Sequence, residues 1–155
     1  DFSEKMIEKS KDMSKKNNVM INLKQADMSK LPYKDNQFDY ILHISSLHHL
    51  DSEEKIFKAL EEAYRVLKPE GLLLLTVWNK LQSRFLFQPK DLIIPWKQQH
   101  KEYQRFYHLF DFVELKKIIK KTNLKIVESN MFGKNLVFVL KKSLDKHLKS
   151  MFNFF

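Results

Sequence analysis

A helix stop followed directly by a buried strand decides the fold class, in residues 65–78, which read RVLKPEGLLLLTVW. Pro69 and Gly71 both interrupt a helix, because proline lacks the backbone N–H and glycine loses more backbone entropy than other residues. Residues 72–77 form a nearly continuous apolar run, which is typical of a strand covered on both faces. Alternation of such strands with helices predicts an α/β domain with a mainly parallel sheet.

The residues before this stretch predict a strand and then a capped helix. Phe38–Ile44 is a short apolar run that indicates another buried strand. Asp51 is a good N-cap, and Glu54 follows at capping-box spacing. Apolar side chains then recur at helical spacing, at Ile56, Leu60, Ala63, Tyr64 and Leu67.

Further upstream, the pattern predicts one more helix and one more strand. Ser3 can cap a helix that places Met6, Ile7 and Met13 on one face. Val19–Leu23 is short and mostly apolar, and we expect it to be a strand. The loop after it, residues 25–36, contains Pro32 and an Asp-Asn turn pair.

Downstream of the stretch, residues 80–110 hold two prolines and seven aromatic residues without a clear period. We expect them to form a functional loop, a substrate-side insertion. Asp111 and Glu114 open another helix, which continues through Lys121. Residues 124–131 and 135–140 predict a strand pair that turns at Gly133. The expected organisation is a domain over 1–141 and a basic tail over 142–155, which is either frayed or a docking segment.

Composition excludes several function classes. Cysteine is absent and glycine occurs only twice, so this chain has no disulfide, no thiolate metal site and no Gly-rich phosphate loop. No apolar run is long enough to span a bilayer, so we expect no membrane partner. Residues 1–79 carry 12 Lys and Arg against 13 Asp and Glu, whereas residues 80–155 carry 16 against 6. A basic half of this kind favours a nucleic-acid partner, although lysine-rich composition bias is the simpler alternative.

A resemblance to a known family rests on four segments, 1-DFSEKM, 25-QADMSKLP, 38-FDYI and 65-RVLKPEG. In order and spacing they resemble the class I S-adenosylmethionine-dependent methyltransferases. The resemblance implies a Rossmann-like sheet with an antiparallel C-terminal hairpin, here lacking the first two strands and the Gly-rich cofactor loop.

A narrower resemblance rests on 47-LHHL, 76-TVW, 93-IIPW and 105-RFYHLF. These segments resemble the tRNA methyltransferases that esterify 5-carboxymethyluridine at the wobble position. The resemblance implies an enzyme that binds S-adenosylmethionine and the anticodon loop in the cytoplasm, with the nucleus as the alternative location. It also implies a small zinc-binding activator protein, which would add a strand to the sheet edge formed by Val19–Leu23.

For the cofactor, the resemblance implies contacts with five residues. Asp1 would accept hydrogen bonds from the ribose hydroxyls and Asp27 from the adenine amino group, with Met28 packed on the ring. His43 and Ile44 would lie along the methionine part. The simpler alternatives are a turn-forming role for Asp27 and a core role for His43.

For the substrate, the resemblance implies stacking and anion-binding side chains, namely Trp78, Trp96, Arg105, Tyr107 and His108. Arg105 and His48 would position the reacting groups, because a carboxylate nucleophile needs no general acid or base. Adjacent histidines point apart on a turn, so His48 and His49 do not predict a metal site. The alternatives are a small-molecule methyltransferase and a non-catalytic fragment that binds RNA or a partner.

Overall fold

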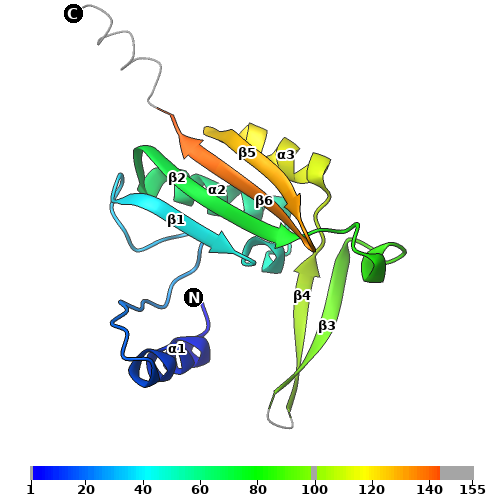
Figure 1. Ribbon diagram of the computed structural model, residues 1–155, viewed down its shortest axis with the longest axis horizontal. Coiled ribbons are helices and arrows are strands. Elements are labelled where there is room, and N and C mark those ends of the chain that lie inside the picture. The colour runs from blue at the N-terminus through cyan, green and yellow to red at the C-terminus, as the bar shows by residue number, and fades with distance from the viewer. Residues whose placement is uncertain (1, 99–100, 144–155) are drawn as a thin grey trace, which may run out of the picture.

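The computed structural model describes residues 2–98 and 101–143. Figure 1 shows their elements, which are in chain order α1 (Glu4–Lys16), β1 (Phe38–Ile44), η1 (Leu47–His49), α2 (Glu53–Val66), β2 (Leu67–Trp78), η2 (Ser83–Phe85), β3 (Asp91–Gln98), β4 (Lys101–His108), α3 (Phe112–Lys121), β5 (Leu124–Phe132) and β6 (Asn135–Lys142). Asp1 and residues 144–155, which include most of the expected basic tail, lie outside the described residues.

The main sheet has the strand order β1-β2-β6-β5. Only β1 and β2 run parallel among the described strands, while β2–β6 and β5–β6 are antiparallel. The α/β class and the closing antiparallel hairpin are therefore confirmed, but the expectation of a mainly parallel sheet is wrong for these residues. The parallel pair arises because α2 forms the crossover between β1 and β2, which a parallel connection requires.

One face of the sheet is covered by α2 and α3, and the core lies between the sheet and these helices (Figure 1). Alternate residues of β2 and β6 point into this core, with Leu73, Leu75 and Phe138 fully buried. On the edge strand β1, Tyr40 and Leu42 are mostly exposed. The prediction that Phe38–Ile44 is a fully buried strand is therefore wrong, because its second face has no covering element among the described residues.

The helix starts follow the capping signals closely. Ser3 caps α1 and Asp111 caps α3, where Glu114 completes a capping box. For α2 the cap is Ser52 rather than Asp51, which instead forms an ion pair with Lys55. Both residues are good caps, so the sequence does not separate two adjacent candidates.

The expected strand at Val19–Leu23 does not form. This segment follows α1 without regular structure, and the side chain of Met20 is fully exposed. A strand is stable only when a neighbour satisfies its backbone groups, and no described strand pairs with this segment. The sheet edge to which we assigned the activator protein is therefore absent from the described structure.

Residues 80–110 are more regular than a loop. The strands β3 and β4 form an antiparallel hairpin, called the arm below, which extends away from the main sheet (Figure 1). The prediction failed because neither strand has a uniform polar face and Pro95 lies inside β3. A two-stranded hairpin tolerates proline at a position that does not donate to its neighbour.

Both glycines have local reasons. A Cβ at Gly71 would lie 2.8 Å from the carbonyl oxygen of Lys68 on the same strand and 3.0 Å from that of Asp39 on β1, so only glycine fits here. Gly133 has a φ of 56° at the turn between β5 and β6, where glycine has no steric penalty. None of the described helices combines the length and the apolar character needed to cross a membrane.

Candidate active site

Aromatic side chains gather where β2 ends. The ring of Trp78, the last residue of β2, stacks on Tyr107 of the arm with centroids 4.6 Å apart and planes 9° from parallel. His48 of η1 contacts both rings at 5.1 and 5.2 Å. Because β1 and β2 are parallel, their carboxyl ends lie at the same edge, which is where open α/β sheets bind ligands. Three of the expected residues thus meet at that edge.

The two histidines of η1 have different roles in this cluster. His48 is buried, its Nδ1 accepts a hydrogen bond from the backbone N–H of Trp78 at 3.4 Å, and burial lowers its pKa to about 3. His48 is therefore neutral near pH 7. A ring nitrogen of His49 lies 3.0 Å from the carbonyl oxygen of Phe106, which ties η1 to the arm. Within residues 2–98 and 101–143, no three or more His, Asp or Glu side chains are arranged so that they could hold a metal ion.

One face of the arm extends the aromatic cluster outward. Alternate residues share a face of a hairpin, and the register pairs Ile94 with Arg105 and Trp96 with Tyr103. The Arg105 guanidinium lies over the Trp96 ring, 4.9 Å from its centroid. Tyr107 continues the same face down to Trp78. The arm therefore carries a track of aromatic rings and arginine, which we call the aromatic track, defined by Trp78, Trp96, Tyr103, Arg105 and Tyr107.

His108 lies on the opposite face of β4 from this track. Its Nδ1 is 2.6 Å from Asp91, and its Nε2 is 3.3 Å from Glu114 of α3. Lys90 bonds the same Glu114 and also Asp111, each at 2.9 Å. The structure therefore places His108 in a charged cluster that fixes the base of the arm to α3, and does not bring it together with the other expected substrate residues.

The carboxyl end of β1 offers polar groups to a ligand. His43 is buried, which lowers its pKa to about 4, and its Nδ1 has no hydrogen-bond partner among the described residues. The same holds for the buried hydroxyl of Ser46. The backbone of Ser45 has a positive φ of 50°, and Ile44 is half-exposed. Orphaned buried polar atoms are rare in folded proteins, so this end of β1 is suited to a polar ligand.

Asp27 combines a turn role with a free oxygen. Its Oδ1 accepts hydrogen bonds from the backbone and the hydroxyl of Ser29 at 2.8 and 2.7 Å, and these bonds lower the pKa of Asp27. Its Oδ2 makes no hydrogen bond within the part of the chain that the structure describes. Met28 beside it packs against the core. Asp1 lies outside the described residues, so its expected role stays a prediction.

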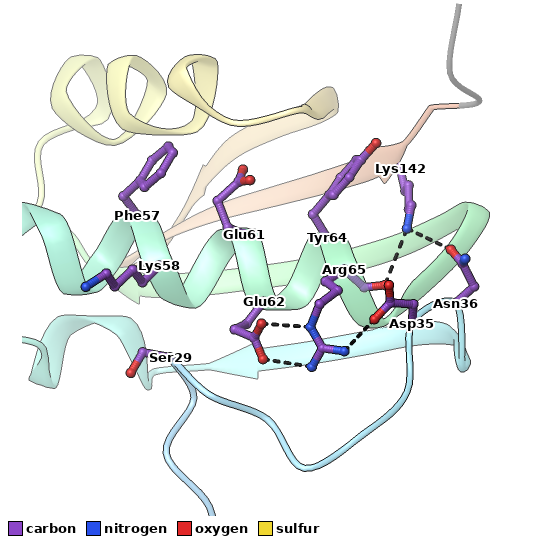
Figure 2. A pocket seen from close by; sticks show the side chains of 10 residues that line it. All are labelled: Ser29, Asp35, Asn36, Phe57, Lys58, Glu61, Glu62, Tyr64, Arg65 and Lys142. Atoms are coloured by element: carbon purple, nitrogen blue, oxygen red, sulfur yellow. Dashed lines mark hydrogen bonds and ion pairs between the residues drawn. The ribbon is translucent and has the colours of Figure 1, made fainter. Parts of the chain in front are cut away.

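A second cluster, at the amino ends of β1 and β2, has a structural role. Figure 2 shows Arg65 of α2 between Glu62 and Asp35. Its nitrogens lie 2.8 Å from Glu62 and 2.7 Å from Asp35, and it also donates to the carbonyl oxygens of Tyr33 and Leu31. Lys142 donates to Asn36 and to two backbone carbonyl oxygens. These bonds fasten the loop before β1 to α2 and leave the Arg65 guanidinium fully engaged.

Sequence reasoning missed Arg84. Its guanidinium lies over the rings of Trp78 and Phe85, 4.7 and 4.3 Å from their centroids. The available signal was composition, because Arg84 is one of only three arginines in a chain with 25 lysines. A scarce residue type near a strand end is a reason to examine it.

Comparisons with known proteins show which families this chain is similar to. A family model described as a methyltransferase domain matches residues 1–75. The chain is 30% identical over 128 residues to the tRNA (carboxymethyluridine(34)-5-O)-methyltransferase of Schizosaccharomyces pombe, covering 66% of this chain and 56% of that protein. The chain spans less than two thirds of the length of the curated relatives it matches.

Solved structures show the same fold. A methyltransferase of Methanosarcina mazei that depends on S-adenosylmethionine superposes with a TM-score of 0.77 at 15% identity, covering 94% of this chain and 81% of that one. The complex of the Haloferax volcanii Trm112 methyltransferase activator with a methyltransferase matches with a TM-score of 0.64 at 13% identity, covering 93% of this chain and 70% of the matched chain.

The fold is therefore that of solved methyltransferases that depend on S-adenosylmethionine, and residues 1–75 match a methyltransferase domain. In sequence, the chain is similar to tRNA (carboxymethyluridine(34)-5-O)-methyltransferases. The end of β1 fits a polar ligand such as S-adenosylmethionine, because two buried polar atoms there, His43 Nδ1 and Ser46 Oγ, have no partner among the described residues.

Proposed function

We propose that the protein containing this chain is a tRNA methyltransferase that esterifies the carboxylate of 5-carboxymethyluridine at the wobble position. The aromatic track carries this proposal. A base splayed from its loop is held by stacking on aromatic rings and arginine, and the track provides both from the strand ends to the arm. The likeness to a tRNA methyltransferase of that specificity supports the same substrate.

The chemistry places few demands on the side chains. S-adenosylmethionine, when bound, supplies a methyl group on a sulfonium. A carboxylate oxygen of the substrate forms the new bond to the methyl carbon as the carbon–sulfur bond breaks, and the sulfur keeps the electron pair. The carboxylate is already ionised at neutral pH, so no residue has to remove a proton. The task of the protein is alignment and exclusion of water.

Several residues are suited to these tasks. Asp27 would hold the adenine amino group through its free Oδ2, Met28 would pack on the ring, and His43 and Ile44 would line the methionine part. Asp1 would bind the ribose hydroxyls. Because neutral His48 packs against both Trp78 and Tyr107, it would hold these rings in place without adding charge beside the sulfonium.

The basic second half would bind the anticodon stem. On α3, Lys116, Lys117 and Lys120 lie on the side away from the buried Leu115, Ile118 and Ile119. Lys121 is paired with Glu53. Contacts to phosphates release counterions, so binding is expected to weaken steeply with added salt. A solvated helix face without RNA contacts is the alternative for these lysines.

An activator protein of the Trm112 kind is a further part of the proposal. The likeness to a methyltransferase solved in complex with such an activator supports it. In place of the expected edge strand, Val19, Met20 and Ile21 form an exposed apolar segment that a partner strand could order. A tRNA substrate would be met in the cytoplasm, or alternatively in the nucleus.

The test is methyl transfer by the whole natural protein, with and without an activator of this kind. The substrates are anticodon stem-loops that carry 5-carboxymethyluridine or uridine at the wobble position, with labelled S-adenosylmethionine as the methyl source. The proposal expects label only in the carboxymethyl stem-loop, in an ester that mild alkali removes. Transfer to a small-molecule acid but not to the stem-loop would contradict it.

A further inference from the structure

The three arginines of the chain differ in what their guanidinium groups can still bind. Arg65 is fully engaged by carboxylates and carbonyl oxygens. Arg105 lies on Trp96, toward the outer part of the arm. Arg84 lies on Trp78 at the carboxyl end of β2. Arg84 is therefore the arginine that stacks on a residue at the strand ends, where the candidate active site lies.

The Arg84 guanidinium is held by neighbours that leave its outer edge free. Its Nε donates to Oε1 of Gln82 at 3.1 Å, and the rings of Trp78 and Phe85 support its plane. Gln82 is itself buried, and its Nε2 donates to the carbonyl oxygen of Lys134 at 2.8 Å. The two terminal nitrogens of Arg84 make no hydrogen bond or ion pair within residues 2–98 and 101–143.

This arrangement is a preorganised anion site. Two terminal N–H groups in one plane match the two oxygens of a carboxylate, and a guanidinium already stacked on aromatic rings loses little side-chain freedom when it binds. The buried amide of Gln82 fixes the direction of the group. No carboxylate of the described residues occupies it, although carboxylates partner Arg65, Lys90 and Lys68 elsewhere.

We propose that Arg84 binds the carboxylate of the substrate in a bidentate manner and thereby determines specificity for an acid over a neutral base. The inference rests on the proposed function and names the residue that selects its substrate. Arg105, which the resemblance suggested for this role, is on the arm and would contact a phosphate or a base. Esterification removes the charge, so the same contact favours the acid substrate over the ester product.

The test compares Arg84→Lys with Arg105→Lys in the whole natural protein. Both substitutions keep the positive charge and remove the planar pair of N–H groups, so Arg105→Lys is a matched control. Dissociation constants are measured for three anticodon stem-loops that differ only at the wobble base: 5-carboxymethyluridine, its methyl ester and uridine. The phosphates are identical in all three. Because Arg84 is exposed, the melting temperature should stay unchanged.

The expected result is selective. The unmodified protein should bind the acid about tenfold or more tightly than the ester or uridine, in line with a charge-assisted bidentate pair. Arg84→Lys should abolish this preference without weakening the binding of the uridine stem-loop. Arg105→Lys should weaken the binding of all three stem-loops by the same factor.

Two results would overturn the inference. If Arg84→Lys weakens the binding of all three stem-loops equally, the Arg84 guanidinium binds a phosphate. If the preference for the acid survives, another residue binds the carboxylate. In both cases methyl transfer by the unmodified protein can still occur, so the proposed function survives. The proposed function itself fails only if the unmodified protein transfers no methyl group to the carboxymethyl stem-loop.

Discussion

Two apolar regions of this molecule differ in structure, since one forms buried strands and the other is exposed and irregular. In the sheet, Phe138 of β6 and Leu75 of β2 are fully buried between their neighbours and the helices α2 and α3. In the segment between α1 and β1, Val19, Met20 and Ile21 are exposed and have no strand partner. Both regions have the composition of strands. The difference shows that an apolar run becomes a strand only where another strand satisfies its backbone groups.

Hydrogen exchange should separate the two regions most widely. Amides of Leu73 and Leu75 lie in a strand that pairs on both sides, so they should exchange only through global unfolding. Amides of Met20 and Ile21 should exchange as in an unstructured chain, about a thousandfold faster or more for a domain of ordinary stability. Measurement is by mass spectrometry or NMR. Comparable protection in both regions would remove the contrast.

Removing a buried ring from the sheet should destabilise the protein far more than shortening a side chain in the exposed segment between α1 and β1. Phe138→Ala removes a fully buried ring that stacks near Phe112, and should lower the free energy of unfolding by about 3–5 kcal/mol. The control Met20→Ala should change it by less than about 0.5 kcal/mol. Urea denaturation measures both. A cost for Met20→Ala near that of Phe138→Ala would mean that the segment packs in solution.

Acid should destabilise the sheet and its helices through the buried histidines of this region. The exposed segment cannot respond in this way, because residues 1–37 contain no histidine. The folded-state pKa values of His43 and His48 are lowered to about 4 and about 3. Below about pH 6.5 the unfolded chain therefore binds protons that the folded chain does not, and stability falls with pH. Each histidine contributes about 1.4 kcal/mol per pH unit until its folded pKa is reached, about 3 kcal/mol in total for His43.

The variant His43→Leu sharpens this prediction, because it removes the titrating group and its unpartnered nitrogen and puts an apolar side chain in the buried position. Its free energy of unfolding should depend less on pH between 6.5 and 4 than that of the unmodified chain. Chemical denaturation at a series of pH values provides the measurement. Parallel pH curves for the two proteins would contradict the assignment of the acid sensitivity to His43.

The two glycines give the smallest expected contrast. A Cβ at Gly71 meets a backbone oxygen of β2 itself, at Lys68, and one of the neighbouring strand β1, at Asp39, so Gly71→Ala should cost about 1–3 kcal/mol. Gly133 has open space and only a positive φ, so the control Gly133→Asn should cost about 1 kcal/mol or less. Thermal melts compare them. An inverted order would contradict the close approach described at Gly71.

Local signals predicted much of the fold. Ser3 and Asp111 cap their helices as predicted, and the hairpin from Leu124 to Lys142 turns at Gly133. These features depend on interactions within a few residues, which a sequence displays directly. Val19–Leu23 and the arm depend on which partner is available, and a single segment does not contain that information.

Only part of the candidate site was predictable, because some of its contacts depend on which residues the fold brings together. The resemblance brought Trp78, His48 and Tyr107 to one place, and the structure stacks them there. It did not separate the two faces of β4, so His108 was grouped with Arg105 although an ion cluster holds it on the other face. Arg84 was missed because its role depends on stacking with Trp78, six residues earlier in the chain, and on the amide of Gln82.

The turn between β5 and β6 links distant parts of the molecule. The carbonyl oxygen of Lys134 accepts hydrogen bonds from the backbone of Asn79 at 3.0 Å and from Gln82 at 2.8 Å. A surface turn of two residues thus sets the direction of the amide that orients Arg84. A substitution that shifts this turn would move the Lys134 carbonyl oxygen, and with it the Gln82 amide and the Arg84 guanidinium, so a turn that lies outside the aromatic track controls the direction of the proposed carboxylate contact.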